Sequence, residues 1–446
     1  MKFLWGAATS AHQIEGYNSR NDWWEWEQLG KIEGGVLSGK ATDHFHRFRE
    51  DIRLAAELKL NSYRFSIEWS RIEPERGKWD PSAIAWYLDL ITECERHGIL
   101  PMATLHHFTS PAWFTAQGGF AQRAAPDLFL NFVKKVVEVM GHRVFHWCTF
   151  NEPMVLVIGS YLAGFMPPAE FDPRRANHAI HNLLRAHVLA YDWIHQEAAE
   201  RGSPVEVGLA HNFIDFRPDR VWHPLEWALT WSLSKFYNWS WIEAVLGRSQ
   251  NFEVAGVLPN IRPVKEAQGR RSVDFLGVNY YTKGYLRWQP KTKEAGNTAQ
   301  LPFGISFARR QEAMSDVGWA IHPRGFRRVL KGAARYGLPI YVTENGIADR
   351  DDAHRAEFIR QHLLEIARAI EKGADIRGYY YWSLLDNFEW IKGFGPRFGL
   401  YHVDYETFER RAHPSADYYR AVIAAHGSQQ APQAEHLRMT RIVGKK

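Results

Sequence analysis

Cysteine is scarce in this chain of 446 residues, which contains only Cys94 and Cys148. Two cysteines cannot build the disulfide framework of a small secreted domain, so we expect a reducing compartment, the cytoplasm. No apolar run approaches the ~20 residues that a transmembrane helix needs. The apolar start MKFLWGAATSA has a single basic residue and continues into HQIEG, which favours a first strand over a signal peptide.

A strong charge of one sign is also missing. The net charge is +5, and residues 428–446 hold four basic residues against one acidic residue, which leaves +2 for the rest of the chain. A body so close to neutral does not indicate a nucleic-acid-binding protein. We therefore predict one globular domain over residues 1–427, followed by a basic, disordered tail over residues 428–446.

Motifs for binding phosphate, cofactors and metals are missing as well. The chain has no glycine-rich loop of a nucleotide-binding protein, and WGAATSAHQ is not one. The histidines of HFH (44–46) and HH (106–107) are not accompanied by an HExxH motif or a third converging ligand. We therefore predict no cofactor and no metal, and we place His44 and His46 at a helix start or in a loop.

The sequence does contain short β-rich runs that alternate with longer helical patterns, which is typical of parallel βαβ units. Residues 84–98 and 356–373 are examples of the helical patterns, and Gly373 is a suitable C-cap for the second. Eight strands in one undivided chain favour a closed (β/α)8 TIM barrel over an open, doubly wound sheet. The predicted strands are 3–8, 61–67, 99–106, 143–150, 205–211, 273–279, 338–343 and 376–382.

Two carboxylates follow predicted strands on the face where a TIM barrel has its active site. Buried strands do not usually end in an ionisable group, yet Glu152 in CTFNEPM and Glu344 in YVTENGI follow the fourth and seventh strands. Such a pair can face each other across the barrel mouth as the acid and the nucleophile of a glycosidase. A role as metal ligand or ion-pair partner is the alternative for each of them.

Amide, imidazole and aromatic groups follow the other strands. They suit a sugar-binding pocket, because hydroxyl groups need donors and acceptors and the sugar ring needs an aromatic floor. The 19 tryptophans of the chain fit such stacking, and they fit core packing equally well. The polar and aromatic residues at the strand ends are His12, Gln13, Arg64, His106, His107, Asn151, Asn279, Tyr281, Asn345 and Trp382.

Eight ordered segments carry a resemblance to a known family: FLWGAATSAHQIEG, YRFSIEWSRI, TFNEP, FLGVNYYT, SDVGWAIHPRG, VTENG, YYWSLLDNFEW and RFGLYHVDY. In this order they resemble glycoside hydrolase family one, the β-glucosidase and β-galactosidase family. The resemblance extends from about residue 3 to about residue 425. It implies a (β/α)8 barrel and retaining hydrolysis of β-linked glycosides.

The resemblance also implies roles for individual residues. It makes Glu152 the acid/base and Glu344 the nucleophile. The nucleophile would be braced by Arg64, Asn279 and Tyr281. The glycone pocket would comprise Gln13, His107, Asn151, Glu389 and Trp390, with Trp382 beneath the sugar.

The two carboxyl groups of a retaining enzyme lie about 5–5.5 Å apart, where two negative charges repel. We expect Arg64 and the Tyr281 hydroxyl to keep Glu344 ionised, so that Glu152 holds the proton. When Glu344 becomes an ester its charge disappears, and Glu152 can then act as the base. This coupling predicts a bell-shaped pH profile that belongs to the pair. Asn151 is expected to bond the 2-hydroxyl of the sugar.

The substrate is constrained by the residues near Glu389. Its carboxylate would repel a phosphate, which favours unphosphorylated β-D-glycosides: glucosides, and also galactosides and fucosides, or short oligosaccharides. Lys392 and Arg397 lie close by in sequence and weaken this argument. Phe108 and Thr109 stand where many members of the family have Trp and Asp, so the hydroxyl preference stays open.

Further alternatives also stay open. The tryptophans of residues 18–28 either line the leaving-group side or pack in the core. The same ester intermediate would serve a transglycosylase, and a non-catalytic sugar-binding barrel would be expected to lack one of the two carboxylates. Because Glu152 is present, the thioglucosidases that carry Gln at this position are not indicated. We expect no nucleic-acid or membrane partner, and the number of subunits stays open.

Overall fold

The computed structural model describes residues 2–249, 261–289, 303–427, 429–440 and 442. Eight parallel strands form a closed barrel within it, because β5 pairs with β6 as well as with β4. This confirms the predicted (β/α)8 fold, and each predicted strand corresponds to one strand of the barrel. The barrel strands are β1 (Leu4–Ala8), β2 (Ser62–Ser66), β3 (Leu100–His106), β4 (His146–Asn151), β5 (Glu206–Pro218), β6 (Phe275–Trp288), β8 (Ile340–Asn345) and β9 (Ile376–Trp382).

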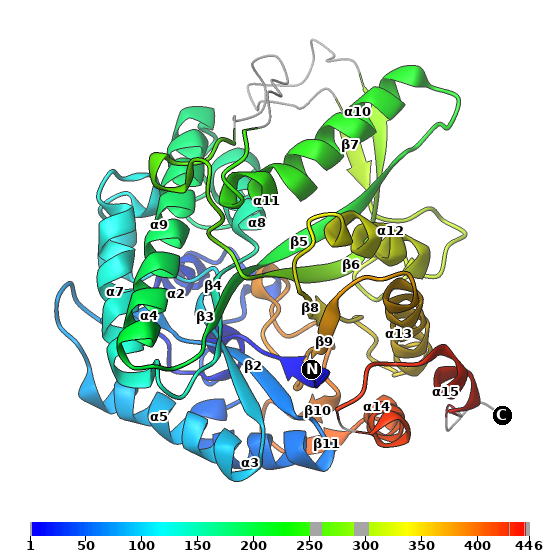
Figure 1. Ribbon diagram of the computed structural model, residues 1–446, viewed down its shortest axis with the longest axis horizontal. Helices are drawn as coiled ribbons and strands as arrows, with labels where there is room; N and C mark the ends of the chain where they lie inside the picture. Colours follow the sequence, from blue (N-terminus) through cyan, green and yellow to red (C-terminus); the bar gives the residue numbers. More distant parts are fainter. Residues whose placement is uncertain (1, 250–260, 290–302, 428, 441, 443–446) are drawn as a thin grey trace.

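Strands β5 and β6 continue well past their predicted ends. Their extensions pair with each other up to Pro218 and Leu286, and β7 (Phe303–Ser306) adds to β6 in the antiparallel direction. Figure 1 shows this extension leaving the barrel beside α10 (Pro224–Ser234). The predicted lengths of these strands were too short, because their outer parts carry mixed polar and apolar residues. A second sheet is the hairpin of β10 (Tyr401–Val403) and β11 (Arg410–Ala412).

Helices surround the barrel, and two of those described begin at an Asp that precedes a Pro. The Asp80 side chain accepts hydrogen bonds from the Ser82 and Ala83 amides, and Pro81 follows it as the first helical residue. This cap starts α5 (Pro81–Arg96) three residues before the predicted helix at 84–98. The longer helices are α3 (His44–Glu57), α5 (Pro81–Arg96), α7 (Ala125–Met140), α9 (Pro173–Glu200), α12 (Pro323–Ala334), α13 (Arg355–Glu371) and α14 (Pro414–His426).

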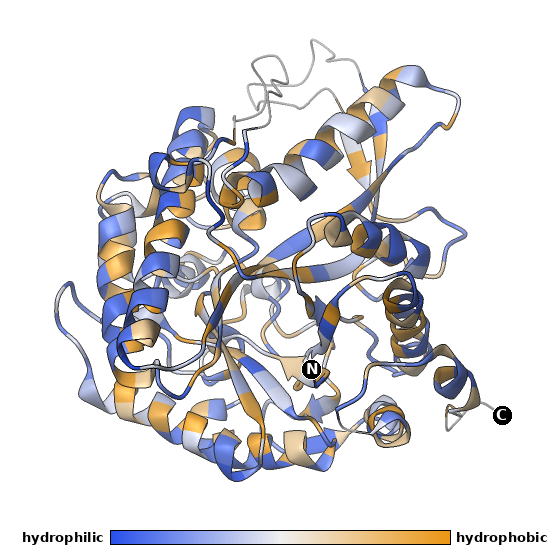
Figure 2. Cartoon of the chain, in the orientation of Figure 1, coloured by the Kyte–Doolittle hydropathy of each residue, from blue (hydrophilic) through white to orange (hydrophobic). Residues whose placement is uncertain are grey.

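Short helices occupy the connections between these elements. His44 begins α3, as predicted, and none of the described helices is long and apolar enough to span a bilayer. In Figure 2 the outer helices carry both hydrophobic and hydrophilic residues, as expected for helices with one buried face. The short helices are α1 (Ala11–Ile14), α2 (Asp22–Gln28), α4 (Trp69–Ile72), α6 (Ala112–Thr115), α8 (Pro153–Ile158), α11 (Ser240–Val245) and α15 (Ala434–Met439).

The interior of the barrel is filled by side chains and forms the floor of the site. Leu4, Met102, Cys148, Phe275 and Tyr380 belong to one buried apolar cluster, separate from the larger core between strands and helices. Large side chains from several strands fill the barrel axis, so the barrel is a packed core and not a pore. Residues at the carboxyl ends of the strands therefore rest on a rigid layer.

The tail differs from the prediction. The Phe3 amide donates to the Gln429 carbonyl at 2.8 Å, and the Trp5 indole nitrogen donates to the Gln430 carbonyl at 2.9 Å. Leu437 on α15 is fully buried. Disorder of the whole segment 428–446 is therefore wrong for residues 429–440, because an apolar side chain and two backbone carbonyls tie them to the barrel. Residues 428, 441 and 443–446 lie outside the described residues.

Candidate active site

Glu152 and Glu344 lie at the carboxyl ends of β4 and β8. Glu344 is the fifth residue of β8 and is 3 % exposed, whereas Glu152 directly follows β4 and is 7 % exposed. The backbone of Glu152 is left-handed, with φ +47°, and its amide donates to the Ala210 carbonyl at 2.7 Å. This conformation is unfavourable for a residue with a Cβ. It turns the chain sharply from β4 into α8, with the Glu152 side chain at the bend.

Arg64 connects the two strand ends. Its guanidinium is fully buried and donates through Nη1 to Glu344 Oε1 at 2.6 Å and through Nη2 to Asn151 Oδ1 at 2.7 Å. The second oxygen of Glu344 accepts from the Tyr281 hydroxyl at 2.6 Å. Each oxygen of Glu344 thus has a donor of its own, one of them charged, and both contacts favour the carboxylate form.

Asn279 lies between the two acidic side chains. Its amide nitrogen donates to Glu152 Oε1 at 2.8 Å and to Asn151 Oδ1 at 3.1 Å. The Thr343 hydroxyl donates to its Oδ1 at 2.6 Å, which fixes the amide orientation. Asn279 was expected to brace Glu344, and it lowers the pKa of Glu344. Its amide nitrogen in addition holds Glu152 and Asn151 by hydrogen bonds.

The two carboxyl groups differ in their electrostatic surroundings. Burial is the main cause that raises the pKa of Glu152 to about 8, and the nearby charge of Glu344 is the second cause. Hydrogen bonds from Asn279 and Asn212 lower this pKa and offset part of the rise. Burial also raises the pKa of Glu344, but there Arg64 and the Tyr281 hydroxyl act in the opposite direction. Only Glu344 contacts a cation directly. The arrangement therefore favours a negative charge on Glu344 and a proton on Glu152 at neutral pH.

Gln13 and Glu389 lie beside this pair. The Gln13 amide nitrogen donates to Asn387 Oδ1 at 2.8 Å and to the Phe388 carbonyl at 2.9 Å, and the Ser10 hydroxyl donates to its Oε1 at 2.6 Å. The Trp382 indole nitrogen donates to Glu389 Oε1 at 3.2 Å. Burial raises the pKa of Glu389 to about 8. These contacts attach the segment after β9 to the end of β1.

His107 is enclosed by two indoles. Its ring stacks on Trp382 and on Trp390, with centroid distances of 5.8 and 6.1 Å. Burial keeps its pKa well below the usual range, so the ring is neutral. Because Asn151 Oδ1 accepts from Arg64 and Asn279, its amide nitrogen is the donor to His107 Nε2 at 3.1 Å. The proton of His107 is therefore on Nδ1.

Other residues singled out in the sequence pack against these side chains or point away from them. His12 stacks on Trp390 and pairs with Glu27, and Trp23 of the 18–28 loop packs on Trp390 with a centroid distance of 4.6 Å.

His106 points away from these residues, with its Nε2 3.0 Å from the Ser110 hydroxyl. The remaining three residues have structural contacts: Phe108 with Trp390, Thr109 with Glu68, and Asn345 with Tyr280 and Tyr379.

Comparison with known proteins identifies the family of this site. The model of Glycosyl hydrolase family 1 matches residues 1–428. The chain belongs to this family. It is 32 % identical to the 1,4-beta-D-glucan glucohydrolase of Thermotoga neapolitana, over 95 % of this chain and 98 % of the relative. It is 30 % identical to the beta-galactosidase of Pyrococcus woesei, over 98 % and 99 %.

A solved structure gives the same result. The beta-glycosidase from Pyrococcus horikoshii is 40 % identical and superposes with a TM-score of 0.85, covering 98 % of this chain and 96 % of that one. This family 1 protein is therefore a β-glycosidase, an enzyme that hydrolyses O-glycosides.

Two residues of the glycosidase site were missed in the sequence. Asn212 on β5 donates to Glu152 Oε1 at 3.1 Å, and its own Oδ1 accepts from the Tyr237 hydroxyl at 2.8 Å. Asn212 directly follows the predicted fifth strand, a position equivalent to that of the polar residues at the other strand ends. Tyr237 lies on the short helix η4 (Lys235–Trp239) and has no signal in the sequence.

The coupling of the two carboxyl groups is testable. We expect Glu344→Gln to lower the pKa of Glu152 below its value of about 8, because the variant removes a nearby negative charge. The titration of Glu152 can be followed by carbon-13 NMR of labelled glutamate side chains, with Glu152→Gln for the assignment. Glu138→Gln, on the exposed side of α7, should leave it unchanged. An equal or higher pKa in Glu344→Gln would contradict the coupling.

Proposed function

We propose that this enzyme is a retaining β-glycosidase that hydrolyses unphosphorylated β-D-glycosides through a covalent glycosyl-enzyme. One observation carries the proposal: two buried carboxyl groups share one hydrogen-bond network, and only Glu344 is bonded to a buried guanidinium. In this proposal Glu344 is the nucleophile and Glu152 is the acid/base. Two identical functional groups with different surroundings are the arrangement that double displacement requires.

In the first step an oxygen of Glu344 attacks the anomeric carbon. The glycosidic C–O bond breaks, its electron pair stays on the leaving oxygen, and Glu152 donates its proton there. The ester leaves Glu344 uncharged, which removes one cause of the raised pKa of Glu152. Glu152 then accepts a proton from water, whose oxygen attacks the anomeric carbon and releases Glu344 as a carboxylate.

The proposed glycone pocket surrounds this pair. Trp382 forms the floor beneath the sugar ring, and Trp390 and His107 complete an aromatic wall beside it. Gln13 and Glu389 bond neighbouring hydroxyl groups in this proposal. Asn151 bonds the 2-hydroxyl, and because Arg64 and Asn279 hold its amide in place, this contact can strengthen in the oxocarbenium-like transition state.

The preference for unphosphorylated sugars has a different basis from the one expected. Since burial raises the pKa of Glu389 to about 8, this group is largely neutral at pH 7 and repels a phosphate only weakly. The nearby cations are already engaged, Lys392 with Glu33 and Arg397 with Asp386 and the Val403 carbonyl. A phosphate on the sugar would therefore be buried without a free cationic partner.

The stereochemical course tests the mechanism. We expect proton NMR of a hydrolysed aryl β-glucoside to show the β-anomer of glucose first, followed by mutarotation. Glu344→Ala should lose turnover of all glycosides, whereas Glu138→Ala should keep it. Initial release of the α-anomer would contradict double displacement, and substantial activity of Glu344→Ala would contradict the role of that residue.

A substrate panel tests the pocket. Nitrophenyl β-D-glucoside, galactoside, fucoside, mannoside and 6-phosphoglucoside are compared by kcat/KM. We expect the glucoside to exceed its 6-phosphate by at least about a hundredfold, because a buried phosphate without a partner loses several kcal/mol of solvation. A preference for the phosphorylated sugar would disprove the proposed glycone.

Asn212 and Tyr237 are positioning residues for Glu152 in this proposal. The Asn212 amide lowers the pKa of Glu152, so its loss in Asn212→Ala should raise that pKa. The fall in kcat/KM at alkaline pH, where Glu152 loses its proton, should then move to higher pH by roughly half a unit or more. Tyr237→Phe should shift it in the same direction, because Asn212 loses the donor that orients it.

Tyr418→Phe on α14 is the matched control, since it removes another buried hydroxyl, and its pH profile should equal that of the unaltered enzyme. An unchanged alkaline limb in Asn212→Ala would mean that the hydrogen bond to Glu152 does not tune its acidity.

A further inference from the structure

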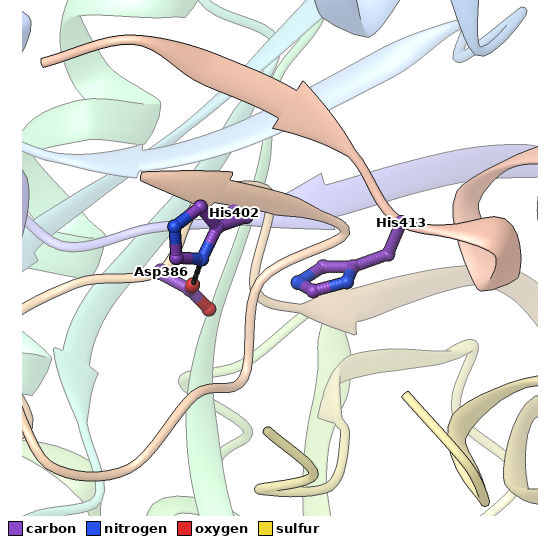
Figure 3. A group of neighbouring side chains, drawn as sticks. All are labelled: Asp386, His402 and His413. Carbon is purple, nitrogen blue, oxygen red and sulfur yellow. Dashed lines mark ion pairs between the residues drawn. The ribbon is translucent and has the colours of Figure 1, made fainter. Parts of the chain in front are cut away.

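A second cluster of polar side chains lies outside the sugar pocket. Asp386 follows β9, His402 is on β10, and His413 lies between β11 and α14. One ligand atom from each residue lies within 4.8 Å of the other two. Figure 3 shows the three side chains converging, with His402 on one strand of the hairpin and His413 just beyond the other. Asp386 precedes Glu389 by three residues, so the cluster adjoins the loop that borders the proposed glycone pocket.

The donor set is typical of a zinc site with an open position. Two imidazole nitrogens and one carboxylate oxygen are common zinc ligands, and a water can complete the tetrahedron. The distance from His402 Nδ1 to Asp386 Oδ2 is 3.2 Å. This is close to the ~3.3 Å between two ligand atoms of a tetrahedral ion with bonds of about 2.0 Å. The His402 side chain is 41 % exposed, which gives an ion access from solvent.

His413 provides an independent observation. Its Nε2 is buried and has no hydrogen-bond partner among the described residues. Buried polar atoms are nearly always paired, because leaving one unpaired costs roughly 1–3 kcal/mol. An imidazole nitrogen without a hydrogen-bond partner can offer its lone pair to a metal ion.

The charges around the cluster are compatible with a cation. Arg397 donates to Asp386 Oδ2 at 3.2 Å, and Arg355 pairs with Asp352 and also acts on Asp349 and Asp386. The three carboxylates carry a total charge of −3 and the two guanidinium groups a total of +2, so that the net charge is −1 before an ion binds. Arg397 can stay on Asp386 as an outer partner, since a carboxylate has several acceptor positions.

We propose that Asp386, His402 and His413 bind one divalent cation of the zinc class. The ion would connect the β10–β11 hairpin to the loop that leads to Glu389, and so hold that loop against the barrel. No metal was expected here from the sequence, because the ligands are 16 and 11 residues apart and belong to no short motif. The proposal is independent of the glycosidase mechanism.

Titration of the chelator-treated full-length enzyme with ZnCl2 tests this site. We expect calorimetry to show one zinc per chain, and Tm to rise by about 3 °C at a zinc concentration a hundredfold above Kd. His402→Gln and His413→Gln should each weaken binding by about a hundredfold or more while keeping kcat/KM. Cobalt(II) in the unaltered enzyme should show the visible absorption of a four-coordinate ion.

His46→Gln is the matched control, because His46 also pairs with a carboxylate, that of Asp43 at 2.7 Å, and is exposed. Zinc binding should survive this substitution. Three results would each overturn the proposal: no zinc bound by the unaltered enzyme, binding that persists in His413→Gln, or binding that disappears in His46→Gln. The kcat/KM of the two site variants reports whether they have folded.

Discussion

The buried guanidinium of Arg64 is the interaction on which the site depends. It rises from β2 inside the barrel and bonds Glu344 on β8 and Asn151 on β4. A buried charge is stable only when its donors are paired, and removing one partner from such a pair typically costs 3–5 kcal/mol. Arg64 and Glu344 therefore require each other, and Asn151 is held as a consequence. Strand ends that are far apart in the sequence become one rigid unit through a single side chain.

The difference between the two carboxyl groups follows from this unit. Arg64 and Tyr281 occupy both oxygens of Glu344, while Glu152 receives only neutral amide donors from Asn279 and Asn212. Both groups lose water, but only one is compensated by a cation. Placement in the barrel, and not the chemistry of glutamate, thus separates their protonation states.

The sequence was sufficient for the barrel and for the centre of the site. Strand spacing predicted all eight barrel strands, and polar residues at their ends included Glu152, Glu344, Arg64 and Tyr281. It failed where the outcome depends on side-chain direction. His106 and His107 are adjacent, but neighbouring residues of an extended segment point to opposite faces, so only His107 contacts Asn151.

Long-range contacts were the second source of error. Asn212 directly follows the predicted fifth strand, but its role depends on Glu152, which lies 60 residues earlier, and Tyr237 reaches it from a helix whose position no local pattern encodes. The basic composition of the tail led to the prediction of disorder, although Leu437 in it is buried. Its burial depends on α13 and α14, which lie beside α15. In each case the deciding partner is distant in the chain, so that local propensity and charge carry no information about it.

The left-handed backbone of Glu152 has a consequence for turnover. A conformation that is costly for a residue with a side chain is maintained by the fold before any sugar arrives, at the expense of about 1–2 kcal/mol of folding free energy. The bend, the flanking strand and the amide donors already restrict the Glu152 side chain, so that little conformational freedom remains to be lost when a sugar binds. If Glu152 is the proton donor, as we propose, its reorganisation during each catalytic cycle is small, and the cost of aiming it in advance is some of the stability of the fold.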